Sequence, residues 1–222
     1  MIMAISFHER IIENKDWATV LFVVCLILIA ITKSIFENRF SDFTKLIYSN
    51  KYIKIYKDST NMLSWFTISL FVVQLISLAF FIQLSLSYFG IVSKTDWLIY
   101  IQIVTLLGVF VLSKYLVEKI IATSFNIEEI LEQFNLQKVN YRTYIGLVLL
   151  PINIILFYNN SVSIMAIYFI LAVILIINIL TYLNSLKIYQ NLILGKLFYF
   201  ILYLCALEIA PYYFMYYWFT RS

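Results

Sequence analysis

The last apolar stretch of the chain, Tyr199 to Trp218, reads YFILYLCALEIAPYYFMYYW. About 20 apolar residues, at 1.5 Å each, form a helix that crosses the roughly 30 Å hydrocarbon core of a bilayer. Glu208 lies near the middle of this stretch, too far from either end for its carboxyl group to reach a membrane surface easily. A carboxyl group at that depth needs a partner, so we expect other helices to pack around it.

The composition of the whole chain supports a membrane protein. Of its 222 residues, 63% are hydrophobic and only 13% are charged, and the mean hydropathy is +0.91. A soluble domain of this length does not have enough interior to bury that much apolar surface. The net charge of +4 is spread between apolar runs, which fits membrane topology and excludes a nucleic-acid-binding face.

Apolar runs recur along the sequence at lengths that suit membrane spans. They predict an all-α, polytopic bundle of about six transmembrane helices in a single domain, at residues 17–35, 63–89, 97–116, 143–158, 162–183 and 197–219. Tryptophans fall at the ends of four of these spans, where an amphipathic ring anchors a helix between headgroups and tails: Trp17, Trp65, Trp97 and Trp218.

Two connections between spans have an amphipathic pattern. In the lysine-rich connection after Lys33, the residues Phe36, Phe40, Phe43 and Ile47 recur at helical spacing, which predicts a helix lying on the membrane surface; a plain linker is the alternative. The segment 119–141 is too polar to cross, and its apolar residues predict a second surface or partner-binding helix. We therefore expect amphipathic connecting helices on the cytoplasmic side.

The basic residues predict the orientation. Twelve of the sixteen lysines and arginines fall in the three connections that share one side of the membrane, and four fall on the side of the termini. Because basic residues concentrate on the cytoplasmic side, both termini are expected on the periplasmic side.

The surroundings of Glu208 can be predicted in part. Pro211 has no backbone N–H, so the last span is expected to bend there, and Tyr212 shares a helix face with Glu208. Ala206 and Ala210 form a small-xxx-small pair on the opposite side, which favours close helix packing.

Polar residues in other spans lie at a similar depth. We expect Gln74, Thr105 and Asn153 to face the bundle interior and at least one of them to meet Glu208. Two roles remain open for that acid: binding or relaying a proton or cation, or fastening the last span to its neighbours through a hydrogen bond. A single acid without an intramembrane base makes a sparse ion pathway, which favours the second role.

Motifs for chemistry are missing from the sequence. The sole histidine, His8, lies in the polar N-terminal segment, and the four glycines are isolated, so no His-based metal site, phosphate loop or catalytic residue is predicted. We expect no cofactor and no metal. Lys114, Glu118 and Lys119 form a helical-spacing cluster that suits a headgroup or partner site, although a solvated helix end is the commoner explanation.

Several segments together suggest a known type of protein. The motif LCALEIAP around Glu208, the entry ENKDW at 13–17, the segments RFSDF and SNKYIKIY, and Pro151 resemble an uncharacterised bacterial multi-pass family, a domain of unknown function in Bacteroidetes-type bacteria. The resemblance implies the inner membrane of a double-membraned bacterium and an envelope-assembly setting, and it assigns no activity.

Two functions from different classes are compatible with these features. The favoured one is a non-enzymatic membrane subunit that binds another membrane protein, or a second copy of itself, and supports assembly of an envelope complex. The alternative is a small proton- or ion-linked transporter that uses Glu208, with Gln74 and Asn153 as polar neighbours.

Overall fold

The structure is a computed structural model, and it describes residues 15–46, 52, 55–56, 64–124, 128–159 and 163–194. Within these ranges every regular element is a helix. The helices are α1 (Asp16–Ile35), α2 (Glu37–Thr44), α4 (Trp65–Tyr88), α5 (Trp97–Ser124), α6 (Glu128–Tyr158) and α7 (Ile164–Leu194). The chain is an all-α membrane protein, and five of these helices are long and apolar enough to cross a bilayer.

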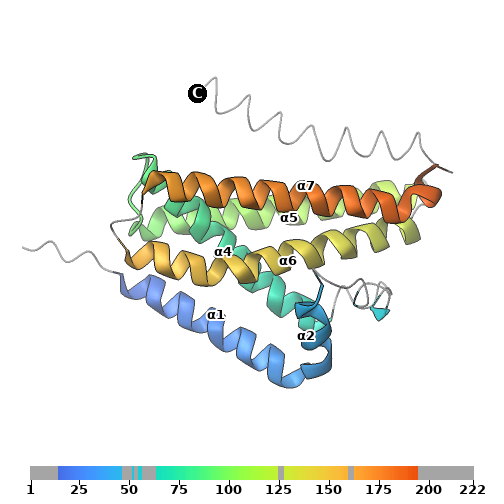
Figure 1. The fold of residues 1–222 in the computed structure, drawn as a ribbon, viewed down its shortest axis with the longest axis horizontal. Coiled ribbons are helices and arrows are strands. Elements are labelled where there is room, and N and C mark those ends of the chain that lie inside the picture. Colours follow the sequence, from blue (N-terminus) through green and yellow to red (C-terminus); the bar gives the residue numbers. More distant parts are fainter. Residues whose placement is uncertain are drawn as a thin grey trace, which may run out of the picture.

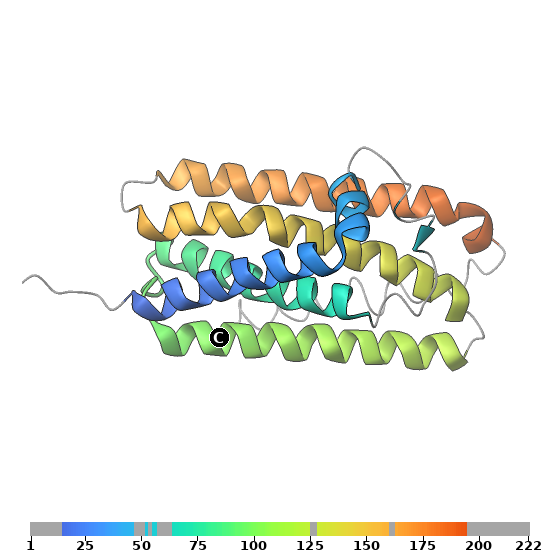
Figure 2. The same ribbon diagram turned by 90° about the horizontal axis from the view of Figure 1, so that it is seen from below.

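The five long helices form a bundle around α4 and α6 (Figures 1 and 2). These two helices make the most extensive contact in the described chain, and α1 packs across α4 on one side. In Figure 2, α5 and α7 are the two outer rows, with α4 and α6 between them. Consequently α5 and α7 present long apolar faces outward, as lipid-facing helices do.

Aromatic side chains fill the core at one end of the bundle. Trp17 stacks on Phe80 with ring centroids 5.6 Å apart and contacts Tyr100 at 5.1 Å, and its indole N–H donates to the Thr95 carbonyl oxygen at 3.2 Å. The Trp17 ring therefore packs within the bundle, whereas Trp97 is partly exposed and Trp65 is mostly exposed at the starts of α5 and α4. Trp218 lies outside the described residues.

The turn between α4 and α5 closes the same end. Gly90 has a φ of 74°, a left-handed conformation that glycine adopts without strain. The Gln83 side-chain amide donates to the carbonyl oxygens of Ser93 and Asp96, at 3.2 and 2.8 Å. Asp96 in turn caps α5 by accepting from the Leu98 N–H at 2.9 Å. This end, with residues 16, 97 and 164, is called the outer end below.

The predicted spans match some helices better than others. α1 and α4 agree with the predicted spans 17–35 and 63–89 to within two residues at each boundary. α5 continues eight residues beyond the predicted end at 116, α6 begins fifteen residues before 143, and α7 continues to Leu194, eleven residues beyond 183. The predicted span 197–219 lies outside the described residues.

The extra length changes the interpretation of segment 119–141. Its described residues continue α5 and α6 in line with their membrane spans, so the prediction of a separate surface helix there is wrong. At 1.5 Å per residue, α5 is about 42 Å long and α6 and α7 are about 46 Å long, which exceeds the roughly 30 Å hydrocarbon core. Three helices are therefore longer than a crossing along the membrane normal requires, and the end opposite the outer end is called the inner end below.

The other connection contains the short helix α2. Its apolar face was predicted to lie on lipid, but Phe43 is fully buried in the protein, where its ring meets Phe66 and Tyr52 at 5.8 and 5.5 Å. Phe36 and Phe40 pack against the same cluster, and Ile47 is not among the described residues. The apolar face of α2 is thus directed at the start of α4, because aromatic partners from several elements meet there.

Candidate functional site

α4 and α6 approach each other closely at Gly146. A Cβ atom added to Gly146 would lie 2.8 Å from the Gln74 Cα atom and 2.8 Å from its Cγ atom. Beside this glycine, the Thr143 hydroxyl donates to the Gln74 side-chain oxygen at 2.9 Å. Gln74 therefore faces another helix, as predicted, and its hydrogen-bond partner is Thr143 of α6.

A second polar contact joins the same two helices about three turns further along α6. The Asn153 side-chain amide donates to the Ser77 carbonyl oxygen at 2.7 Å and to the Ser77 hydroxyl at 3.1 Å. Asn153 is completely buried, as predicted. Between the two polar contacts, Cys25, Val73 and Leu150 pack together with almost no exposed surface. The α4–α6 contact is thus closed by apolar side chains and fastened by the three interhelical hydrogen bonds that Thr143 and Asn153 donate.

Thr105 does not join this group. Its side chain is exposed on α5 within the described ranges, and the last span that was predicted to meet it lies outside them. Residue count along a span gives depth but not direction, and the inward face of α5 is the one that carries Tyr100 and Gly108. Of the three predicted polar residues, Gln74 and Asn153 therefore make contacts between described helices, and Thr105 makes none there.

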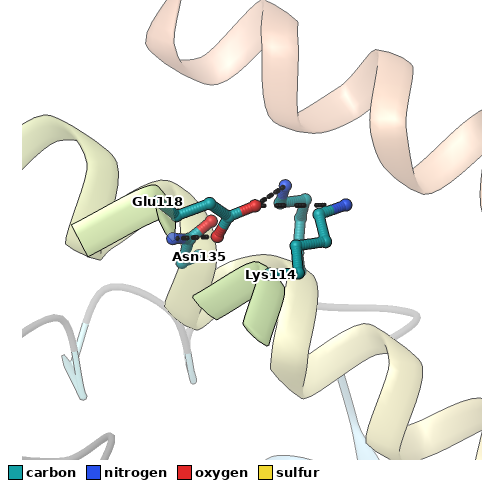
Figure 3. A network of polar contacts seen from close by, with 4 residues as sticks. Lys114, Glu118 and Asn135 are labelled. Carbon is teal, nitrogen blue, oxygen red and sulfur yellow. Dashed lines mark hydrogen bonds and ion pairs between the residues drawn. The ribbon is translucent and has the colours of Figure 1, made fainter. Parts of the chain in front are cut away.

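A charged cluster joins α5 and α6 near the inner end (Figure 3). The Asn135 amide donates to Oε2 of Glu118 at 2.7 Å, and the ammonium groups of Lys114 and Lys138 each lie 4.0 Å from Oε1. Glu118 is 5% exposed and Lys138 is 9% exposed. These four residues are called the Glu118 cluster below.

The burial of this cluster corrects a prediction. Lys114 and Glu118 were favoured as part of a solvated helix end, but only the neighbouring Lys119 is exposed. The sequence interpretation failed because it ended α5 at 116 and began the next span at 143. Asn135 and Lys138, three residues apart on one face of an earlier-starting helix, are the signal that it missed.

The Glu118 cluster sits close to the membrane boundary. Glu118 lies 21 residues beyond Trp97 on α5, and Lys138 lies 20 residues before Tyr158 on α6, about 30 Å from the outer end in both cases. Ion pairs and a charge-assisted hydrogen bond there hold the two helices together where they leave the hydrocarbon core. The Glu118 cluster therefore holds the inner parts of α5 and α6 against each other.

Further polar side chains are buried on other faces of the projecting part of α6. Gln137 is fully buried and Asn140 is 4% exposed. Both amide atoms of Gln137, and the side-chain nitrogen of Asn140, have no hydrogen-bond partner in the part of the chain that the structure describes. Burying an amide group without a hydrogen-bond partner costs free energy.

α2 is fastened to the start of α4 by one arginine. The Arg39 guanidinium donates to the Ser64 hydroxyl at 2.9 Å and to the Tyr52 hydroxyl at 3.3 Å, and it lies 4.6 Å from the centre of the Phe66 ring. Burial raises the pKa of Tyr52, although the hydrogen bond from Arg39 opposes this effect. Arg39 therefore gives the inner end a second polar contact between helices. From the sequence, Arg39 was used only in the count of basic residues that predicts orientation.

The remaining predicted site residues cannot be placed. Glu208 and its predicted neighbours, together with the small-residue pair of the last span, lie outside the described residues: Pro211, Tyr212, Ala206 and Ala210. In the described ranges, no three histidine, cysteine, aspartate or glutamate side chains gather as a metal site would require. The clusters that the structure does describe connect helices.

Comparison with known proteins gives one result. Neither the curated proteins nor the solved structures yielded a match to this chain. The family model described as Domain of unknown function (DUF4271) matches residues 18–219, which cover every helix described above except the first two residues of α1. The chain therefore belongs to the DUF4271 family and is an integral membrane protein of that family.

Proposed function

We propose that this protein is a non-enzymatic membrane subunit that holds a partner protein at the inner end of its bundle and supports assembly of a bacterial envelope complex. The observation that carries the proposal is the projecting inner end. α5, α6 and α7 extend about 12 to 16 Å further than the hydrocarbon core requires, and the buried Glu118 cluster links two of them.

Two further features support this role over transport. The α4–α6 contact around Cys25, Val73 and Leu150 is filled by packed side chains, and Gly146 allows the two backbones to approach closely. A transporter of alternating access needs its central helices to separate around a midplane site. Helices locked in this way suit a rigid scaffold better.

The side of the membrane is part of the proposal. The basic residues of the described chain concentrate at the inner end, which favours a cytoplasmic location for the projecting helices and a periplasmic one for the outer end. The resemblance noted in the sequence implies the inner membrane of a double-membraned bacterium. The partner is then a cytoplasmic protein, or a membrane protein with a cytoplasmic part.

Charge reversal at the inner end tests the proposal. Lys119→Glu and Glu128→Lys change exposed residues at the ends of α5 and α6 and leave the Glu118 cluster intact. We expect each to abolish or strongly weaken co-purification of the partner in mild detergent, in both directions of pull-down. The matched control is Lys94→Glu, which reverses a lysine in the connection at the outer end and should leave the complex intact.

Two results would contradict the proposal. One is a chain that purifies alone even after chemical cross-linking in membranes. The other is a complex that Lys94→Glu disrupts as much as Lys119→Glu does. A pH-dependent flux through proteoliposomes of the purified chain that disappears in Glu208→Gln would support the transporter instead.

A further inference from the structure

Basic and acidic residues lie at different depths near the inner end of α5 and α6. Measured along these helices, Lys114 and Arg142 lie about 25 Å from the outer end, and Lys138 lies about 30 Å from it. Three acids of α6 are further away, by about 9 Å or more beyond Lys138: Glu128, Glu129 and Glu132. The three cations therefore lie near the depth of the lipid phosphates, because the hydrocarbon core is roughly 30 Å thick.

The cations at this depth outnumber the acids. Lys114 and Lys138 share the carboxylate of Glu118, and each ammonium group lies 4.0 Å from Oε1. Arg142 follows Lys138 by one turn on the same face of α6, and it makes no hydrogen bond or ion pair within the part of the chain that the structure describes. Three positive charges and one negative charge thus leave an excess of two positive charges.

Burial makes this excess charge costly. The Lys138 side chain is 9% exposed and the Lys114 side chain is 10% exposed, whereas Arg142 is partly exposed. Removing a charged group from water costs free energy that an opposite charge or hydrogen bonds must offset. An anion beside these side chains offsets that cost, and the partly exposed guanidinium group of Arg142 is the part that it can reach from outside.

One buried acceptor at the same contact has no donor. The Asn135 amide nitrogen donates to Glu118, but the side-chain oxygen of Asn135 is buried and has no hydrogen-bond partner in the described ranges. Figure 3 shows this amide on one side of the Glu118 carboxylate and Lys114 on the other. Cations and a free acceptor together suit a ligand that carries an anionic group next to a hydroxyl group.

We propose that Lys114, Lys138 and Arg142 bind the phosphate group of an anionic phospholipid in the membrane leaflet at the inner end. Ammonium and guanidinium groups donate charge-assisted hydrogen bonds to phosphate oxygens, and basic sites between transmembrane helices bind anionic headgroups in this way. The depth favours a lipid over a soluble phosphate. Lys114 and Arg142 begin inside the hydrocarbon core, and their long side chains reach its edge.

The undescribed parts of the chain offer few acids that could replace this lipid. Residues 47–63 contain one acid, Asp58, and residues 195–222 contain one, Glu208. Asp58 directly follows Lys57, so a cation accompanies it in the sequence. Glu208 lies near the middle of its apolar stretch, whereas the three cations lie near the membrane boundary. A lipid phosphate is therefore the anion that this depth supplies best.

Lipid binding by the purified full-length chain tests the proposal. The protein in a neutral detergent is titrated with phosphatidylglycerol or with phosphatidylcholine, and native mass spectrometry counts the lipids bound to the folded protein. Because the excess positive charge attracts an anionic headgroup, we expect phosphatidylglycerol to bind at least about tenfold more tightly. Equal binding of the two lipids would overturn the proposal without any variant.

Arg142→Gln removes one cation and leaves the contacts of Glu118 in place. We expect the affinity for phosphatidylglycerol to fall about fivefold, and Arg142→Lys, which keeps the charge, to retain it within about twofold. The matched control is Lys33→Gln, which removes an exposed cation about 25 Å along α1 from the same end. A loss in Lys33→Gln equal to that in Arg142→Gln would assign the binding to surface charge in general and contradict the proposal.

Two further measurements separate the lipid from other anions. Inorganic phosphate at millimolar concentration should not displace phosphatidylglycerol, and displacement would assign the site to a soluble phosphate instead. Asp58→Asn and Glu208→Gln should leave the affinity for phosphatidylglycerol unchanged. A rise in affinity with either substitution would show that an acid of the chain itself occupies the site, which would overturn the proposal.

Discussion

At the residue scale, the contact between α4 and α6 depends on one missing methyl group. Gly146 touches the backbone of Gln74, so any larger residue must push the two helices apart. Gly108, on α5, has only the tip of Leu75 at 3.8 Å from the position of an added Cβ atom. Two glycines that look alike in the sequence therefore have opposite sensitivities.

Gly146→Ala is expected to destabilise the protein by about 1 to 3 kcal/mol, because overpacking at a backbone contact cannot be relieved by turning a side chain. The measurement is unfolding in mixed detergent followed by circular dichroism. Gly108→Ala is the control and should be neutral or stabilising by up to about 1 kcal/mol, since alanine favours the helix over glycine. Equal effects from the two substitutions would disprove the close approach at Gly146.

Asn153→Leu tests the deeper polar contact. The substitution removes the amide that donates to the Ser77 carbonyl and hydroxyl, and we expect a loss of about 0.6 to 1.7 kcal/mol. Asn178→Leu is the matched control, because that amide bonds only within its own helix and faces outward. If Asn178→Leu destabilised the protein as much as Asn153→Leu, the loss of stability would come from removing an amide from a membrane helix and not from the α4–α6 contact.

At the element scale, the length of α5 and α6 decides what happens at the membrane boundary. Both helices are longer than the hydrocarbon core is thick, and Glu118, Asn135 and Lys138 meet near their inner ends, where the side chains are buried. Had α5 ended at 116, as the sequence suggested, Glu118 would be a solvated residue. Continuation of the helices therefore creates the cluster.

Glu118→Leu should cost on the order of 3 kcal/mol, because it leaves the ammonium groups of Lys114 and Lys138 buried without this carboxylate. Adding Lys138→Met should restore part of the loss, which a double-mutant cycle measures. Lys119→Leu, at the exposed neighbouring position, is the control and should change stability by less than about 0.5 kcal/mol. Additive effects of the two cluster substitutions would show that Glu118 and Lys138 do not interact.

At the scale of the whole molecule, five described helices cross in alternating directions and give the bundle two chemically different ends. The outer end is closed by stacked aromatic rings around Trp17, and the inner end by charged and amide side chains. This asymmetry matches the distribution of basic residues. It places Ser163 and Ser124 at opposite ends of the bundle.

Thiol labelling tests this orientation. In a chain with Cys25→Ala and Cys205→Ala, Ser163→Cys should react with a membrane-impermeant reagent in spheroplasts. Ser124→Cys should react only after the membrane is opened, because it lies at the inner end with the basic residues. The reverse pattern would mean that the inner end faces outward, and identical labelling of both would contradict the number of crossings between them.

The sequence by itself determined the class of the protein and the approximate position of five described spans. Hydropathy and length are local properties, and a bilayer demands them wherever a helix crosses. For the same reason α1 and α4, which are apolar almost from end to end, were predicted to within two residues at each boundary. Asn153 was predicted to be interior because a buried amide in a span requires a partner.

Only the tertiary structure decided that α5, α6 and α7 continue beyond the predicted spans, and which of their polar residues contact a described neighbour. Outside the hydrocarbon core a helix has no hydropathy signal, so its length depends on what packs beside it, as Glu118 and Asn135 show. The direction in which a side chain points likewise depends on the helices that pack beside it. Phe43 points inward because aromatic residues of several elements meet it, and the sequence of α2 alone does not show where those residues lie.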